Sequence, residues 1–543
     1  MTTTETSLDE ASTDASDGAA SSILSWVAAD DHKKVGRLYL ILGTLGLLAT
    51  VVLNVIINVE RIDGTDTVLD EDAWAQLFDA QRIGMVFGAL LPLAMGLCLV
   101  VVPLQLGARA LAFPRMAMAG MWAWLGGLVL NVISLANDGG SAGLESDMVG
   151  LYIASQALMA IGLVASAGAL VTSILTTRAP GLTMRRVPFF SWSALVFGLG
   201  LILMMPVLVG TLIYLFVDHR YGSREAFGGN LGSLAWAGWA YTQPATFLYA
   251  VPAVGVFADV AVGSFGRRAP GRGFLFGGLS LIGVAALAGI TQQNIQSLPL
   301  PGDGIDTDQL GDIFRDLVPF ALFNSLPVLG ALLVFLVVLV AAKPEKGKKL
   351  TVSPALGFAF FGYGMVLVGM LGNLIYAVDD LALQGTVFEE ATLVYIVYGG
   401  VLGVLGGIAH WSPKWRGGTA SSGAILSLSL LGVAGTVLAA LPHYVAGFLD
   451  QPAGFAYDDS DLQIWNVLAL VGHALFGLMA LGFAGLVLRV KPGDDDADDP
   501  WGGQTAEWLT ASPAPENNFD ELVLVGSAEP AYDAERELEG SDA

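Results

Sequence analysis

The chain has 543 residues, of which 54% are hydrophobic and only 14% are charged. A soluble protein of this length would carry about 25% charged residues, so the composition excludes a row of soluble domains and favours one continuous membrane domain. The single cysteine, Cys98, lies in an apolar stretch and excludes an internal disulfide, an iron–sulfur site and a dicopper thiolate centre.

The formal net charge of −24 is concentrated at the two ends of the chain. The first 31 residues contain Asp and Glu but no Lys or Arg, and the segment after Lys491 stays acidic to Asp542. Acidic runs repel themselves and remain solvated, so residues 1–31 and 492–543 are predicted to be disordered tails around a membrane domain at 32–491. No basic region precedes the first apolar run, so no cleaved signal peptide is expected. The acidic, Lys-poor composition suits very high salt and suggests an extreme halophile as the source.

Apolar runs long enough to cross a bilayer recur along the chain, and about twelve are predicted to be membrane-spanning helices. Their expected ranges in chain order are 36–58, 82–106, 116–136, 149–176, 190–216, 235–263, 273–294, 317–342, 353–378, 390–411, 421–446 and 463–489. The predicted fold class is therefore an all-α integral membrane protein.

The loops between these spans alternate in charge. Basic loops include His32 to Lys34, Arg178 to Arg186 and Lys343 to Lys349, whereas acidic loops include Asp63 to Asp72 and Asp303 to Asp316. One loop on the acidic side, around Asp218 to Arg220, is nearly neutral. Because basic loops stay in the cytoplasm, the pattern predicts an even number of spans in the cell membrane, with both termini cytoplasmic.

Five short stretches carry a family resemblance. They are Asp31 to Leu40, Pro103 to Met116, Arg178 to Trp192 (the most specific), His410 to Lys414 and Leu441 to Tyr444. In this order and spacing, the chain resembles subunit I of the haem–copper oxidases (cytochrome c oxidase subunit I-like) across about residues 31–490. The resemblance implies a twelve-helix bundle that holds two haems and a copper ion.

That family's chemistry requires six histidine ligands, but this chain has only five histidines in total. They are His32, His219, His410, His443 and His473, and none falls on a ligand position of the family pattern. Imidazole is the usual neutral ligand of haem iron and of copper, so the resemblance implies a member whose ligands have been replaced.

The replaced positions can be read from the matching motifs. They are Gln81 in the second span, Gln243 in the sixth, Gln292 and Gln293 in the seventh, and Thr392 and Val394 in the tenth, where a one-residue shift would give Ala391 and Leu393 instead. The family's proton routes are altered too. Arg109 stands where the family has an acid, the stretch Leu322 to Leu326 has no lysine, and the arginine pair expected before the twelfth span is missing.

Each singled-out residue has an ordinary interpretation beside a functional one. The glutamines are interpreted first as a buried network of hydrogen-bonded amides, and second as the lining of a wet cavity or of a site for an apolar ligand that fills the haem volume. Asp259 is interpreted as an interfacial acid in preference to a proton relay. His473 is interpreted as a packed histidine in preference to a haem ligand, and Glu389-Glu390 as acids favoured at a helix N-terminus in preference to a cation site.

These observations predict no catalytic residue, no metal site and no cofactor. The favoured hypothesis is a haem-free accessory or structural subunit of a respiratory electron-transfer complex. One alternative is a protein that binds or transports a small ligand, quinone or ion through the emptied cavity, and another is an active cytochrome c oxidase subunit. The expected partners are the lipid bilayer and other respiratory or blue-copper membrane subunits, and no nucleic acid.

Overall fold

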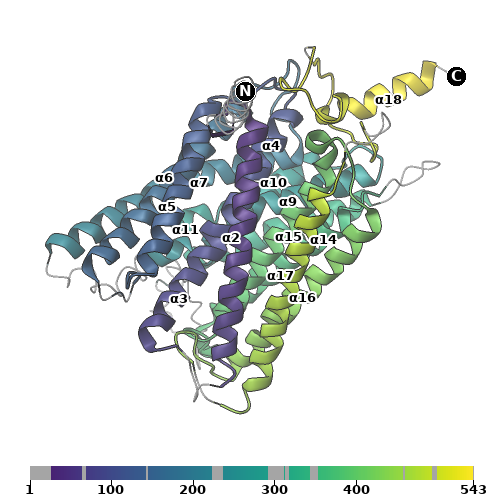
Figure 1. Cartoon of the computed structure of the whole chain (residues 1–543). Coiled ribbons are helices and arrows are strands. Elements are labelled where there is room, and N and C mark those ends of the chain that lie inside the picture. Colours follow the sequence, from purple (N-terminus) through teal and green to yellow (C-terminus); the bar gives the residue numbers. More distant parts are fainter. Residues whose placement is uncertain are drawn as a thin grey trace, which may run out of the picture.

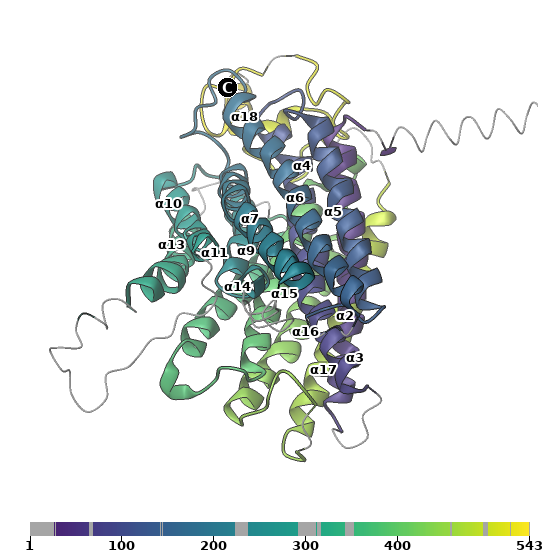
Figure 2. The same ribbon diagram turned by 90° about the vertical axis from the view of Figure 1, so that its left-hand side faces the viewer.

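The computed structural model describes residues 26–27, 29–63, 69–141, 143, 145–222, 237–291, 311, 317–342, 352–456, 459–491, 498–521 and 523–541. These residues form an elongated bundle of long helices that run roughly side by side (Figures 1 and 2). The helices are α2 (His32–Glu60), α3 (Glu71–Ile83), α4 (Leu91–Gln105), α5 (Pro114–Leu135), α6 (Ser146–Thr176), α7 (Phe189–Tyr221), α9 (Ala245–Ser264), α10 (Arg272–Gly283), α11 (Ala286–Ile290), α13 (Leu326–Ala341), α14 (Leu356–Tyr376), α15 (Phe388–Arg416), α16 (Ser422–Phe448), α17 (Gln463–Leu488) and α18 (Pro530–Ser541).

Within the described part of the chain, twelve helical stretches are long and apolar enough to cross a membrane, which confirms the predicted all-α membrane fold. Several boundaries differ from the expected ones by four residues or more, and two of these differences change how a span is built. The second span starts at Asp72 instead of residue 82, because polar α3 continues through the π-helix η1 (Gly84–Leu90) into α4. The seventh ends at Ile290 and is divided into α10 and α11.

Three spans form the centre of the bundle. The most apolar stretches of the second and tenth spans are entirely buried and that of the sixth is 94% buried, whereas those of the other nine described spans are 39–61% buried. The central spans are α4 with α3 and η1, α9, and α15. Their side chains contact other helices on every face, so any buried chemistry of the bundle must involve these three elements.

Local sequence explains several helix ends. The carboxylate of Asp31 accepts a hydrogen bond from the Lys33 amide at 2.9 Å and caps α2, and Asp70 caps α3 in the same way through Ala73 at 2.8 Å. At the C-terminal end of α15, Gly417 adopts a φ of +72°, a left-handed conformation that glycine tolerates.

The sixth span corrects one sequence expectation. The predicted sixth span at 235–263 places Gln243 inside a helix, but α9 begins at Ala245 and Pro244 is its N-cap residue. Gln243 therefore precedes the helix and follows the short 3-10 turn η2 (Gly238–Ala240). A new helix begins after Pro244 because proline has no amide hydrogen to donate inside a helix but is tolerated where a helix begins.

The predicted disorder of the C-terminal tail is wrong for residues 498–521 and 523–541, which pack over one end of the bundle (Figure 1). We call these residues the cap. The prediction rested on the acidic charge, but the cap also buries apolar side chains, among them Trp508, Phe519 and Val525. Burial of this apolar surface favours the ordered state. Of the expected tails at 1–31 and 492–543, residues 1–25, 28, 492–497, 522 and 542–543 lie outside the described residues.

Basic residues of the bundle hold the cap. The Lys33 ammonium donates to the carbonyls of Pro515 and Glu516 at 2.9 and 3.0 Å, and Lys414 donates to the carbonyls of Asp498 and Thr510 at 2.8 and 2.6 Å. His32 at the start of α2 lies 3.1 Å from the Asn518 side chain. The start of the first span and the C-terminal segment therefore lie at the same end of the bundle, which we call the cap end, as an even number of spans requires.

Candidate functional site

The former ligand positions that the structure describes lie in the three central spans. Gln81 is near the end of α3, Gln243 directly precedes α9, and Thr392 and Val394 lie in the first turns of α15. Each side chain is at most 3% exposed. Gln292 and Gln293 lie outside the described residues.

Gln81 belongs to a chain of buried polar side chains. Its amide nitrogen donates to the Asn54 oxygen at 2.8 Å, and the Asn54 amide donates to the Tyr398 hydroxyl at 3.2 Å. The same hydroxyl lies 2.8 Å from Nδ1 of His473. The interpretation of Gln81 as a hydrogen-bonded amide and of His473 as a packed histidine agrees with these contacts.

Aromatic rings fill the space beside this polar chain. The Tyr398 ring stacks on Phe476 with 3.7 Å between centroids. The Thr392 hydroxyl donates to the Tyr444 hydroxyl at 3.3 Å, and the Tyr444 ring packs on Phe388 with centroids 4.3 Å apart. Thr392 is therefore bordered by packed rings, and Val394 is buried two residues further along α15.

Gln243 is 3% exposed and does not face lipid, as expected from the sequence. Among the described residues, its amide nitrogen has no hydrogen-bond partner, and neither do Trp239 Nε1, the Tyr241 hydroxyl and the Thr246 hydroxyl nearby in sequence. The predicted convergence of Gln243 with Gln292 and Gln293 remains a prediction, because the two partners lie outside the described residues.

Three of the other histidines contact separate partners, and the fourth, His443, interacts electrostatically with His473. His32 contacts the Leu99 carbonyl at 2.8 Å, His219 contacts the Ser146 carbonyl at 2.7 Å, and His410 contacts the Ser353 hydroxyl at 3.1 Å. His443 is 1% exposed in α16. No group of three or more His, Cys, Asp or Glu side chains within the described ranges is arranged to hold a metal ion.

Glu389 and Glu390 lie in the first turn of α15, as their interpretation as helix N-terminal acids requires. The sequence did not reveal their partners. Both Glu390 carboxylate oxygens accept from the Arg61 guanidinium at 2.7 and 2.8 Å, and Glu389 pairs with Arg82 at 3.3 Å. These ion pairs occupy the end of the bundle opposite the cap.

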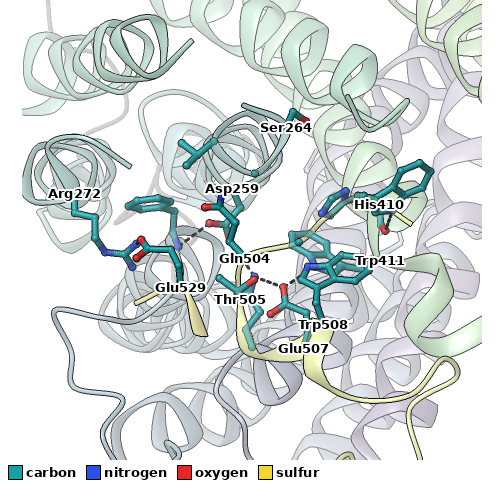
Figure 3. A pocket seen from close by; sticks show the side chains of 16 residues that line it. Asp259, Ser264, Arg272, His410, Trp411, Gln504, Thr505, Glu507, Trp508 and Glu529 are labelled. Carbon is teal, nitrogen blue, oxygen red and sulfur yellow. Dashed lines mark hydrogen bonds and ion pairs between the residues drawn. The ribbon is translucent and has the colours of Figure 1, made fainter. Parts of the chain in front are cut away.

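A small cavity of about 30 Å³ lies at the cap end (Figure 3). Its lining comes from α4, α7, α9, α10, α15 and the cap. The polar members include Gln105, Asp259, Arg272, Glu507 and Glu529. Figure 3 shows Asp259 and Glu507 on facing sides, with Arg272 and Glu529 paired beside them.

Asp259 acts as a cap for another helix. Its Oδ1 accepts from the Phe189 amide at 3.0 Å, and its Oδ2 accepts from the Phe190 amide at 2.9 Å, so the carboxylate binds the N-terminus of α7. The Gln105 amide nitrogen donates to Oδ2 at 3.0 Å. The sequence interpretation as an interfacial acid is thus refined to a structural contact between α9, α7 and α4.

Glu507 was missed by sequence reasoning because it lies in the tail that was expected to be disordered. It belongs to the 3-10 turn η7 (Ala506–Leu509) and is 1% exposed. Its Oε1 accepts from Gln105 Nε2 at 3.1 Å and from Trp411 Nε1 at 3.0 Å. Two tryptophans in an otherwise acidic tail, Trp501 and Trp508, were the available sequence signal that this segment packs against the bundle.

The fold and its buried positions define a polytopic membrane protein with buried polar side chains, and comparisons show which proteins it resembles. Residues 34–292 match the family model of cytochrome c and quinol oxidase polypeptide I. A putative cytochrome c oxidase subunit 1-beta of Streptomyces avermitilis is 28% identical, over 94% of this chain and 92% of that protein. A heme-copper oxidase subunit I+III of Aeropyrum pernix is 28% identical, over 93% of this chain and 62% of that protein.

The fold agrees with these matches. A solved heme-copper terminal oxidase dimer superposes with a TM-score of 0.62 at 12% sequence identity and covers 94% of this chain and 99% of that one. In sequence and in fold, the chain is therefore similar to subunit I of the haem–copper oxidases. It is a multi-pass membrane protein of the cytochrome c oxidase subunit I-like type.

Proposed function

We propose that this chain is a haem-free relative of oxidase subunit I that serves as an accessory or structural subunit of a membrane electron-transfer complex, without oxygen chemistry of its own. One observation carries the proposal. The buried positions that correspond to the family's ligands bear amide, hydroxyl and aliphatic side chains, at Gln81, Gln243, Thr392 and Val394.

The donor chemistry at these positions does not fit a haem or a haem–copper centre. Haem iron and copper take imidazole nitrogens, and glutamine is a poor substitute for either metal. His473 and His443 offer imidazoles in this region, and Nε2 of His473 is not used by the hydrogen bond between its Nδ1 and the Tyr398 hydroxyl at 2.8 Å, but two imidazoles cannot replace the six histidine ligands of the family. The Tyr398 ring is stacked on Phe476 at 3.7 Å, which leaves no slot for a macrocycle between them. No electron-transfer step is therefore assigned to these residues.

The absorption spectrum of the full chain, purified in mild detergent, tests the haem-free state. We expect no Soret band in the reduced or oxidised protein, and copper well below one ion per chain by mass spectrometry. A spectrum with about one haem per chain would overturn the proposal. In that case His473→Ala would identify the ligand, because loss of the band would assign iron binding to His473.

The accessory role is tested by gentle purification of the tagged chain from its own membranes. We expect it to co-purify with a redox subunit that carries its own haem or copper, such as a subunit II or a membrane blue-copper protein. Recovery of the chain alone, together with a stoichiometric quinone-like molecule, would instead support the small-ligand function. Gln243→Leu separates the two, because it should abolish ligand binding and leave a folded structural subunit attached to its partner.

A further inference from the structure

Glu507 contacts the bundle through a buried carboxylate whose hydrogen-bond donors are neutral side chains. The carboxylate is buried and accepts hydrogen bonds from two neutral donors, Gln105 and Trp411, both through Oε1. Among the described residues, Oε2 has no hydrogen-bond partner. A buried carboxylate without a cation or a full set of donors is costly in its charged form, so this geometry favours a neutral acid.

Most charged groups around Glu507 are acids or are paired with another group. Those that line the cavity or adjoin it are Asp259 on α9, Arg272 on α10, His410 and Lys414 on α15, and Asp498, Asp499 and Glu529 in the cap. Arg272 is paired with Glu529 at 3.0 Å. Lys414 attracts Glu507 electrostatically, but its ammonium is hydrogen-bonded to two cap carbonyls.

The nearest acid makes the environment still less favourable for a second negative charge. Asp259 and Glu507 accept from the same Gln105 nitrogen, at 3.0 and 3.1 Å. Both Asp259 oxygens already accept backbone amides of α7, which stabilise its ionised form. Two negative charges bridged by one neutral amide repel each other, so the proton of the pair belongs on Glu507.

We propose that Glu507 is a proton-binding site that couples pH to the attachment of the cap: the protonated side chain holds η7 on the bundle, and loss of the proton releases it. Release would separate Glu507 from Gln105 and Trp411 and open the cavity beneath η7 to solvent. The site is independent of whether the chain carries a haem, so its test does not depend on the proposed function.

The direction of the pH effect follows from the pKa of Glu507. Burial is the largest cause and, with the charge of Asp259, outweighs the opposing hydrogen bonds from Thr505, Gln105 and the Glu507 backbone, so that the pKa rises from its ordinary value of 4.5 to about 7. A released Glu507 loses its proton near pH 4.5, whereas an attached Glu507 keeps it to about pH 7. The opening constant of η7 therefore rises with pH between these values and levels off above 7.

Thiol accessibility measures this opening directly. Ala506, in η7, is 1% exposed, and Asp520 in the same cap is exposed. Cysteine is introduced at one or the other position, Ala506→Cys or Asp520→Cys, in a Cys98→Ser background. The full chain in lipid nanodiscs is labelled with a membrane-impermeable maleimide from pH 5.5 to 8.5. The ratio of the two rates removes the intrinsic pH dependence of the thiol reaction.

We expect this ratio to rise at least about tenfold over the range, with most of the rise below pH 7.5. Glu507→Gln reproduces the protonated acid in shape and neutrality, so it should keep the ratio low and flat. Glu521→Gln, at an exposed glutamate of the cap, should leave the pH dependence intact.

Two results would overturn the proposal. A flat ratio in the parent chain would do so, and this measurement does not depend on whether the Glu507→Gln variant folds. A ratio that responds to replacement of sodium or potassium by a large organic cation, and not to pH, would assign the cavity to a metal cation instead of a proton.

Discussion

Arg61 and Glu390 form the most enclosed ion pair in the described part of the chain, with side chains that are 1% and 3% exposed. Arg61 also donates to the Ala453 carbonyl at 2.8 Å, and its own carbonyl accepts from Asn466 at 2.9 Å. The pair therefore ties the end of α2 to the start of α15, the α16–α17 loop and α17. An enclosed pair of this kind is sensitive to the loss of one partner, because the other charge remains buried.

Glu390→Gln is expected to lower the free energy of unfolding by about 3–5 kcal/mol, since it leaves the Arg61 guanidinium buried without a countercharge. Thermal unfolding in detergent measures the loss. Asp380→Asn, an exposed acid at the same end, should change stability by less than about 1 kcal/mol. The double variant Arg61→Leu/Glu390→Leu should recover much of the loss, and a single variant as stable as the control would contradict the argument.

For single residues, the sequence predicted some roles but not the ion-pair and hydrogen-bond partners. Glu389-Glu390 could be placed at a helix N-terminus from local sequence. Arg61, 329 residues away along the chain, could not be assigned to Glu390 because no local pattern encodes that pairing. Gln81 was correctly interpreted as a buried amide, but the chain through Asn54 and Tyr398 to His473 depends on the packing of four different helices.

Helix pairs in the bundle approach closely where glycines face each other. At Gly472 in α17, an added methyl group would lie 2.0 Å from the backbone nitrogen of Ala439 in α16. Gly435 in α16 has the reciprocal position, since a methyl group there would lie 2.8 Å from the Phe476 nitrogen. Small residues at such crossings permit backbone contact between membrane helices.

Gly472→Ala is expected to push α16 and α17 apart and to destabilise the protein by about 1–3 kcal/mol, the usual cost of overpacking. Gly485→Ala on the same helix meets no atom within 4 Å and is the matched control, which should be neutral or slightly stabilising. The measurement is the midpoint of thermal unfolding for both variants. Equal midpoints would show that the crossing at Gly472 is not tight.

At the scale of elements, hydropathy was sufficient to predict the number and order of the spans. It failed at the start of the second and sixth spans. In the second, α3 is too polar to register as membrane-spanning but continues into η1 and α4. In the sixth, Gln243 was placed inside a helix because the apolar run is continuous, whereas the backbone starts a new helix after Pro244.

In the whole molecule, the start of α2 and the cap lie at the same end of the bundle. At this end Lys33, Lys414 and Arg272 bind residues of the cap. The loops at this end are the basic set, whereas the acidic Asp379-Asp380 loop is at the opposite end. The alternation of loop charge thus agrees with the observed arrangement of the spans. The membrane side on which the cap end lies is a separate prediction from the positive-inside rule.

Reporter fusions test this orientation. A reporter that is active only in the cytoplasm is joined before residue 26 or after residue 543, and we expect both fusions to be active. A fusion within the Asp379-Asp380 loop is the control and should be inactive. An inactive reporter at both ends with an active loop fusion would invert the orientation, and opposite results at the two ends would contradict the even number of spans.

The cap was the largest feature that the sequence prediction missed. The net charge predicts disorder for the tail taken as an isolated chain. In the folded protein the tail is ordered because basic side chains from distant spans bind it and its tryptophans are buried. Asn518 illustrates this, because its oxygen accepts from Lys33 at 2.8 Å and its nitrogen donates to the Ala108 carbonyl at 2.8 Å. Neither contact follows from the composition of the tail.

The cap also sets an order of events during synthesis. Two of its anchors, Lys33 and Ala108, lie in the first fifth of the given sequence and Lys414 lies much later, whereas the cap follows the twelfth described span. During synthesis, Lys33 and Ala108 therefore lack their cap partners until the twelve described spans and residues 498–521 have been made. A nascent or truncated product without the cap would be distinguished by the exposed lysines that the cap covers.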